Sequence, residues 1–144
     1  MKMPPKQKIL EAYSAIADHR ITMKEQEAEC VSSDGSKTYA ISWDGDTYAS
    51  SDNATYWQGY PGYPVLAVLL LQGRLTYDEK LVSEMAGIPW KKLNDSHKRD
   101  YEAAAREGMK DIPDQKEILA LAEKNNEELS HLNLTMKRKI RRTK

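Results

Sequence analysis

The sequence predicts an α+β protein: an N-terminal helix, a small antiparallel β-sheet packed on a buried helix, and C-terminal amphipathic helices. Apolar residues recur at every second position between residues 20 and 50, and at every third or fourth position after residue 76. These are the periods of strands and helices. Between the two regions lies the most apolar run of the chain, residues 65–71, directly after four aromatic residues at positions 56–63. We expect the core to be built on this run.

The first helix is expected over residues 5–18. Ile9, Tyr13 and Ile16 fall at spacings of three and four, which places them on one apolar stripe. Pro4 and Pro5 suit the entry to a helix, where a missing N–H costs no intrahelical hydrogen bond.

Three or four antiparallel strands are expected between residues 20 and 50. The dipeptides Asp34-Gly35 and Asp44-Gly45 supply tight turns, because glycine accepts the positive φ that such turns require. In the strand between these turns, alternation puts three large residues on one face: Tyr39, Ile41 and Trp43.

Residues 51–63 have the composition of an ordered loop, since Gly59, Pro61 and Gly62 interrupt any regular element. Pro64 then fits the first turn of a helix that runs to residue 72, with Gly73 as its left-handed terminator. A buried strand is the alternative, because periodicity does not separate the two in so short a run. The flanking proline and glycine favour the helix.

Three helices are expected after residue 75. Residues 76–79 match a capping box, a second helix opens at 89–90 and carries one apolar stripe as far as Ala104, and a last long helix begins at 113–114. Along the last helix a narrow seam recurs at alternating steps of four and three. It favours docking on its own domain, and a homodimer face is the alternative. The seam residues are Ile118, Ala122, Asn125, Leu129 and Leu132.

Charge is distributed unevenly along the chain. The 22 basic and 22 acidic residues balance, yet residues 137–144 hold six of the basic residues and no acidic one. The rest of the chain is therefore acidic, and a cationic end follows it. We expect three parts: residues 1–74 with the sheet and the buried helix, a helical region at 75–135, and a flexible basic tail at 136–144.

Composition indicates a soluble, cytoplasmic protein. Of the 144 residues, 40% are apolar and 31% are charged. Cys30 is the single cysteine, so no intramolecular disulfide forms and a reducing compartment is expected. The chain starts without the apolar region of a signal peptide, and its apolar run is far shorter than the ~20 residues of a membrane-spanning helix. We expect no membrane partner.

Residues 37–71 combine a hairpin pattern at 39–46, a strand-like segment at 48–52, and a glycine that leads into an apolar helix at 62–70. This layout resembles the SWIM zinc-finger family, whose members place a Cys-x-Cys pair after the hairpin and a Cys-x-His pair before the helix. The corresponding positions fall near Ala49, Ser51, Gly62 and Pro64, and none of these binds zinc. The resemblance therefore implies a metal-free relative. In it, buried aromatic rings stabilise the segments that the zinc ion holds together in other members of the family. We expect no metal and no cofactor.

The sequence favours a non-enzymatic interaction module that binds a macromolecule, either another protein or nucleic acid through the basic tail. Aromatic rings stack on bases, and lysine and arginine contact phosphates without sequence preference. For the rings, packing over the apolar helix is the favoured explanation and a binding platform the alternative, with Trp57 the ring expected to be most exposed. The candidate binding residues are Trp57, Tyr60, Tyr63, Lys137, Arg138, Lys139, Arg141 and Arg142.

No pattern in the sequence predicts an enzyme. His19, His97 and His131 are spaced like no metal motif, and Cys30 alternates inward on a strand as a small apolar residue. We expect no catalytic residue. The alternative to the interaction module is a self-associating structural or adaptor protein, with the seam at 118–132 as its dimer face.

Overall fold

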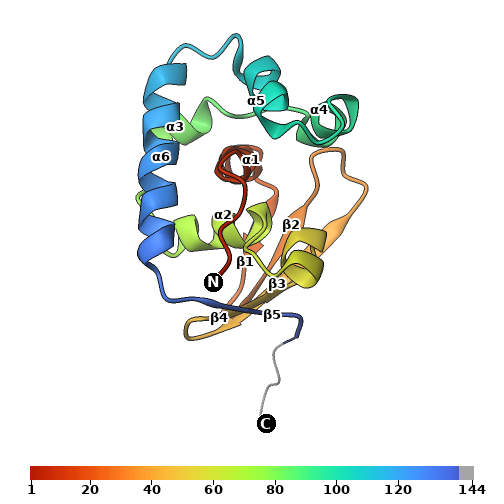
Figure 1. Cartoon of the computed structure of the whole chain (residues 1–144), viewed down its shortest axis with the longest axis vertical. Helices are drawn as coiled ribbons and strands as arrows, with labels where there is room; N and C mark the ends of the chain where they lie inside the picture. The colour runs from red at the N-terminus through yellow and green to blue at the C-terminus, as the bar shows by residue number, and fades with distance from the viewer. Residues whose placement is uncertain (140–144) are drawn as a thin grey trace.

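A five-stranded sheet curls around helix α2 in the computed structural model, which describes residues 1–139 (Figure 1). The strands lie in chain order. The first four pair as antiparallel neighbours, and the last pairs in parallel with β4. Their bounds are β1 Ile21–Met23, β2 Glu27–Val31, β3 Thr38–Asp44, β4 Thr47–Ser50 and β5 Thr135–Lys137. The α+β class and the four sequential strands are as the sequence predicts.

The period of two along the strands separates a buried face from an exposed one. Ala28 pairs with Ile41 and Cys30 with Tyr39, and this register turns all four side chains toward α2. Ala28, Cys30 and Ile41 are completely buried. Gly45 adopts a φ of 59° in the turn between β3 and β4, a conformation that favours glycine.

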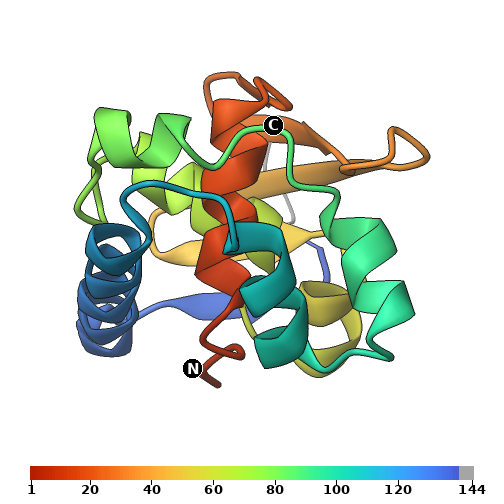
Figure 2. The ribbon, with the colours of Figure 1, turned by 90° about the horizontal axis from the view of Figure 1, so that it is seen from above.

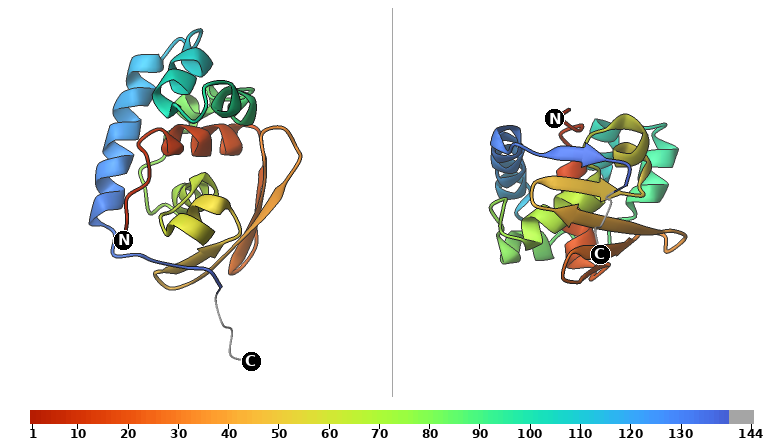
Figure 3. Two further views of the ribbon diagram at one scale, coloured as in Figure 1. Left: turned by 45° about the vertical axis from the view of Figure 1, so that its right-hand side comes forward. Right: turned by 90° about the horizontal axis from the view of Figure 1, so that it is seen from below.

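Helix α2, Tyr63–Leu71, lies between the sheet and helix α1, Lys8–Ala17 (Figure 3). Every residue from 64 to 70 is buried, and only the end residues Tyr63 and Leu71 reach solvent. Pro64 sits in its first turn, and Gly73 follows its end at a φ of 76°. The predicted helix is confirmed, and the alternative of a buried strand is wrong.

Four further helices flank α1: in Figure 2, α3 and α6 lie to one side of it and α4 and α5 to the other. They are α3 Glu79–Ser83, α4 Trp90–Ser96, α5 Tyr101–Met109 and α6 Gln115–His131. One hydrophobic cluster of buried side chains runs from Ile9 to Leu134 and joins both halves of the chain. A short π-helix, η1 Ala54–Gln58, lies within the segment that the sequence predicts to be an irregular loop.

The predicted capping box at residues 76–79 is wrong. The N-cap of α3 is Asp78, whose carboxylate accepts a hydrogen bond from the Leu81 N–H at 3.1 Å. Thr76 instead contacts α6: its N–H donates to Glu128 Oε1 at 2.9 Å, and its hydroxyl donates to the other carboxylate oxygen. A distant carboxylate has replaced the local partner that the sequence pattern suggests.

The single helix predicted from residue 89 onward is two helices. Lys98 and Arg99 adopt φ values of 51° and 67° between α4 and α5, which ends one helix and reverses the chain. Gly108 lies inside α5, where a Cβ atom would approach Ile88 Cγ2 to 2.9 Å. This glycine therefore permits close packing of α5 and does not terminate a helix.

The seam of α6 packs inside its own chain. Ile118, Ala122, Asn125 and Leu129 are buried, and Leu132 packs against the same core. Asn125 accepts a hydrogen bond from the Tyr13 hydroxyl and donates to the Thr76 carbonyl at 2.9 Å. The favoured prediction, docking of this seam on its own domain, is confirmed, and the alternative of a homodimer face formed by these side chains has no support in the structure.

Candidate functional site

A buried hydrogen-bond network holds the aromatic segment at residues 54–63. Asp52 Oδ2 accepts from the Thr55 N–H at 3.1 Å, and Oδ1 of the same carboxylate accepts from the Ser50 hydroxyl. Thr55 Oγ1 accepts from the Gly62 N–H at 3.0 Å. Ser50, Asp52 and Thr55 are all buried. We call these three residues and Gly62 the Asp52 network, and it ties the start of the segment to its end.

Gly62 has a steric role in this network. A Cβ atom at this position would lie 2.1 Å from Asp52 Oδ2, which is less than any real contact. The backbone of Gly62 is extended, with a φ of −74°, so its conformation is open to any residue. Space beside the carboxylate, and not backbone freedom, therefore requires glycine here.

The segment presents two rings to one arginine. The rings of Tyr56 and Trp57 meet edge to face, with centroids 4.7 Å apart and planes at 75°. The Arg138 guanidinium carbon lies 5.3 Å from the Tyr56 centroid and 5.0 Å from that of Trp57, and Arg138 Nε donates to the Tyr56 carbonyl at 3.2 Å. We call Tyr56, Trp57 and Arg138 the Arg138 platform. Trp57 remains 63% exposed within it.

Strand β5 brings Arg138 to the rings. Lys137 pairs with Ala49 of β4, and the Thr135 N–H donates to the Asp46 carbonyl at 3.0 Å. Residues 136 and 137 are thus part of the sheet, although the sequence predicts them in a flexible tail. Arg138 follows the strand directly, so the register of β5 decides where its guanidinium lies.

A hollow of about 510 Å³ opens beside the platform on the outer face of the sheet. Its wall on the platform side contains Tyr56, Arg138 and Lys139. Its opposite wall contains Lys24 and Glu29, which pair at 3.7 Å. The floor is made of small side chains, among them Ala40, Ser42 and Ala49. The platform therefore borders an open, shallow surface of mixed charge.

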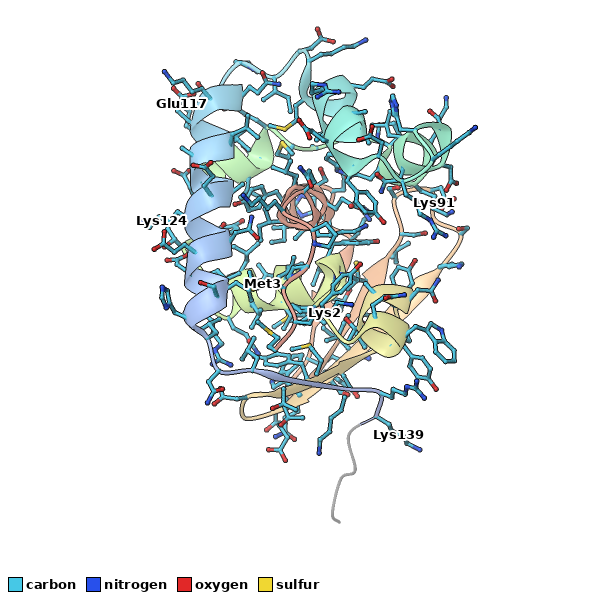
Figure 4. All side chains as sticks on the ribbon, viewed as in Figure 1. Lys2, Met3, Lys91, Glu117, Lys124 and Lys139 are labelled. Carbon is cyan, nitrogen blue, oxygen red and sulfur yellow. The ribbon has the colours of Figure 1, made fainter. Side chains whose placement is uncertain are left out.

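The described basic residues of the C-terminal segment are Lys137, Arg138 and Lys139. Figure 4 labels Lys139 where the chain leaves the sheet. Lys137 and Lys139 are exposed, so their charges are free to meet an anionic partner beside the platform. The predicted binding residues Arg141 and Arg142 lie outside the described residues.

Tyr60 and Tyr63 do not join the platform, in contrast to the sequence-based grouping. Tyr63 turns inward and meets Tyr39 edge to face, with centroids 6.2 Å apart. Burial raises the pKa of the Tyr63 hydroxyl well above its ordinary value. Tyr60 lies toward the N-terminal segment, with Lys2 Nζ 5.6 Å from its centroid. The aromatic residues at positions 56–63 are therefore divided: Tyr56 and Trp57 form the platform, whereas Tyr63 packs toward the interior.

Sequence reasoning missed Tyr56 as a site residue and missed β5 altogether. A strand of three residues with a single apolar side chain, Met136, has too little periodicity to be recognised. The one sequence feature that could have indicated Tyr56 is its position next to Trp57. Its contact with Arg138, 82 residues further along the chain, has no local signature.

The histidines and the cysteine lie apart. Burial raises the pKa of the Cys30 thiol to about 11, so the thiol stays protonated at neutral pH. His97 Nε2 meets Glu107 Oε1 at 3.0 Å on the surface of α4 and α5. Within residues 1–139, no group of three or more His, Cys, Asp or Glu side chains is placed to hold a metal ion. In the same part of the chain, no helix has the length and apolarity to cross a membrane.

Comparison with known proteins identifies one family. The family model described as Uncharacterised conserved protein UCP014422 matches residues 1–135, nearly the whole chain. No curated protein and no solved structure matches. The match includes the aromatic segment and ends at the first residue of β5.

Proposed function

The chain belongs to this family, and we propose that it is a non-enzymatic interaction module that binds single-stranded nucleic acid on the Arg138 platform. One observation carries the proposal: Trp57 is 63% exposed, yet its ring is held by Tyr56 and Arg138. A large aromatic ring that is exposed to water forgoes the stabilisation that burial of its apolar surface would give. A fixed ring also pays little conformational entropy when a partner binds.

The chemistry of the platform fits bases and phosphates together. An exposed indole stacks on any base, and such stacking contributes about 1–3 kcal/mol per base. Arg138 beside the ring supplies a planar cation that pairs with phosphate. Lys137 and Lys139 place two further charges on either side of it along the chain. The expected recognition is therefore indifferent to sequence and sensitive to salt.

Titration with a mixed-sequence single-stranded oligonucleotide tests this proposal. Quenching of tryptophan fluorescence reports on stacking in the unmodified protein, because Trp57 is exposed whereas Trp43 is partly buried and Trp90 is buried. The anisotropy of a dye-labelled oligonucleotide measures the affinities of the variants. We expect Trp57→Ala to weaken binding roughly 5- to 150-fold, the loss of one stacked base. The matched control is Tyr77→Ala, which removes an exposed ring outside the platform and leaves affinity unchanged. Equal affinities of the two variants refute stacking on Trp57.

A salt series separates the contribution of charge. Each phosphate contact adds a nearly constant amount to the slope of log affinity against log salt concentration. Arg138→Ala is expected to reduce that slope by about one and to weaken binding, whereas Arg106→Ala, an exposed arginine on α5, leaves both unchanged. Removal of residues 140–144 is expected to reduce the slope further. Binding that does not respond to salt contradicts the proposal.

Self-association through another surface is the second candidate. Met3 and Leu119 are exposed apolar residues that line a hollow of about 700 Å³ between the N-terminal segment and α6. Sedimentation at two protein concentrations tests it: a dimer that uses this hollow dissociates on Leu119→Glu. Sedimentation as a monomer at both concentrations rejects this candidate.

For residues 37–71 we propose a metal-free relative of the SWIM zinc-finger family. The Asp52 network lies between the β3–β4 hairpin and α2, where that family places its metal, and its buried hydrogen bonds tie the same two segments together. Addition of zinc or of a chelator is then expected to leave the unfolding temperature unchanged. A rise of several degrees with equimolar zinc contradicts the proposal.

A further inference from the structure

A second group of positive charges lies at the turn between α4 and α5, apart from the Arg138 platform. Residues 90–99 contain four lysine and arginine residues and a single acidic residue, Asp95, although the chain before its basic end is acidic overall. Lys92, Lys98 and Arg99 are exposed. We call Lys98 and Arg99, which form the turn itself, the basic turn.

The carboxylates next to the basic turn already have partners. The Asp100 carboxylate accepts a hydrogen bond from the Ala103 N–H at 3.1 Å and so caps α5. Two others pair at 3.1 and 3.3 Å with cations four residues away: Asp95 with Lys91, and Glu102 with Arg106. Within residues 1–139, no carboxylate pairs with Lys98 or Arg99. Both charges are therefore free to meet an anionic partner.

The backbone of the basic turn has a conformation that favours glycine. The Lys98 N–H donates to the Asp95 carbonyl at 3.2 Å and the Arg99 N–H to the Asn94 carbonyl at 2.9 Å, the pattern that ends many helices on a left-handed residue. Lys98 and Arg99 have φ values of 51° and 67°. Glycine is the usual residue in this conformation, because a Cβ atom makes it less stable. The chain keeps two long cations here instead, and such strain is typical of functional positions.

Two aromatic side chains lie between the platform and the basic turn. Tyr60 follows Trp57 by three residues, so their Cα atoms are at most about 11 Å apart. Burial raises the pKa of the Tyr60 hydroxyl and the charge of Lys8 opposes this shift, which places Tyr60 near Lys8. The Lys8 ammonium also lies 4.1 Å from the centroid of the Tyr101 ring, two residues after Arg99. In Figures 1 and 2, α4 and the turn after it lie on the same side of the molecule as η1.

We propose that a nucleic-acid strand that stacks on Trp57 continues past Tyr60 to the basic turn, where Lys98 and Arg99 contact its phosphates. This inference rests on the proposed function and extends it, because it adds a second contact area and gives the strand a path. Charge complementarity selects the occupant: two cations without partners attract a chain that carries one phosphate per nucleotide. Tyr60 offers a ring on which a further base stacks. The bound strand is therefore longer than the platform alone holds.

Glycine substitution in the basic turn tests the proposal with a variant that keeps the fold. Because glycine accepts these φ values, Lys98→Gly/Arg99→Gly is expected to unfold at the same temperature as the unmodified protein or at a higher one. We expect its affinity for a dye-labelled single-stranded dodecanucleotide of mixed sequence to fall at least tenfold at low salt. The slope of log affinity against log salt concentration is expected to fall by about 0.7 for each lost phosphate contact. Affinity for a trinucleotide, which occupies the platform alone, stays unchanged.

The matched control is Lys116→Ala/Lys124→Ala, which removes the same net charge from exposed positions of α6. Figure 4 labels Lys124 on the side of the molecule opposite to Lys91 of α4. We expect this control to leave the affinity for the dodecanucleotide and its salt slope nearly unchanged.

The outcomes separate this inference from the proposed function. If the glycine variant binds the dodecanucleotide as the unmodified protein does, while Trp57→Ala weakens binding, the path to the basic turn is wrong and the proposed function stands. Absence of binding to the unmodified protein overturns both. A polyglutamate peptide of the same net charge is the competing ligand. If it binds as tightly as the dodecanucleotide and loses affinity in the glycine variant, the basic turn recognises acidic protein and the proposal is overturned.

Discussion

Asp52 accepts hydrogen bonds from Ser50 and Thr55 and lies against the α-carbon of Gly62, so both ends of the aromatic segment depend on one carboxylate. At the opposite side of the core, Glu128 accepts hydrogen bonds from Thr76 and Asn125. In both places a carboxylate satisfies backbone and side-chain donors that would otherwise be buried without a partner. The stability of the loops at residues 51–62 and 74–78 is therefore set by single residues.

Gly62→Ala is expected to lower the free energy of unfolding by about 1–3 kcal/mol, because the new methyl group displaces Asp52 from its hydrogen bonds. In an Asp52→Ala background the same substitution meets no carboxylate, and its cost falls to a few tenths of a kcal/mol. Urea unfolding of the four proteins in this double-mutant cycle measures the coupling. Additive effects contradict the steric explanation.

Glu128 predicts a pH-dependent contribution to stability. Burial opposes its ionisation, but the hydrogen bonds from Thr76 and Asn125 outweigh burial and lower the pKa of this carboxyl below its ordinary 4.5. A carboxyl with a lowered folded-state pKa stabilises the fold above the unfolded-state pKa, and this stability is lost as pH falls through the folded-state pKa. Glu128→Gln is therefore expected to cost about 1 kcal/mol at pH 7 and much less at about pH 3.

Urea unfolding at the two pH values measures this difference. The matched control is Glu127→Gln, because Glu127 is an exposed neighbour whose carboxylate Oε1 lies 4.0 Å from His131 Nε2. We expect its effect to be small at both pH values. A constant cost of Glu128→Gln across this range would show that its hydrogen bonds do not favour the ionised form.

At the scale of elements, α2 forms because of its own sequence, whereas β5 forms because of the strand it pairs with. Helix α2 is bounded by Pro64 and the left-handed Gly73, and its residues are apolar all round, so any fold of this chain must bury it. Strand β5 has only three residues, and it forms because β4 offers an unpaired edge in parallel register. The edge is covered by β5, which also places Arg138 over the rings of η1.

Thr135→Pro tests the role of β5. Proline removes the N–H that bonds to the Asp46 carbonyl at 3.0 Å, and the strand is expected to detach from β4. Arg138 then leaves the rings, and we expect Trp57 fluorescence to be quenched more strongly by acrylamide. Hydrogen exchange of the β4 amides is also expected to accelerate. Lys139→Pro, beyond the strand, is the control and is expected to leave both signals unchanged.

At the scale of the whole molecule, one core joins the sheet, α2, α1 and the outer helices. Tyr13 of α1 and Asn125 of α6 are both buried and hydrogen-bonded to each other, which ties residues 112 positions apart. Ser14 accepts a hydrogen bond from Trp90 Nε1 at 2.8 Å and donates to the Met85 carbonyl at 2.6 Å. Helix α1 thus contacts α2 with its apolar face and binds the outer helices through polar groups.

Leu129→Ala is expected to lower the free energy of unfolding by about 2–5 kcal/mol, since Leu129 is 1% exposed in the core. The loss is expected to be the same at all protein concentrations, because the residue packs within its own chain. Leu119→Ala, at a position of α6 that is 45% exposed, is the control and is expected to change stability by less than about 0.5 kcal/mol. A concentration-dependent cost at Leu129 contradicts the intramolecular seam.

Much of the fold follows from local pattern. The α+β class, the first four strands, the Asp-Gly turns, α2 and the start of α6 depend on periodicity and on glycine and proline, which act within a few residues. The errors lie where distant partners compete with local ones. Thr76 bonds to Glu128 and not to a neighbouring glutamate, and Lys98 and Arg99 interrupt an apolar stripe that continues on both sides of them.

The candidate site was predictable only in part. The exposure of Trp57 and the cationic character of residues 137–139 are visible in the sequence, whereas the inward turn of Tyr63 depends on its position at the start of α2. The contact of Arg138 with Trp57 is decided by tertiary structure alone. Sequence determines which residues seek water or apolar surroundings, because solvation and backbone preference are local properties. Which of them meet is decided when the faces of all elements pack at once, because only the packed core sets the register and distance between segments far apart in the chain.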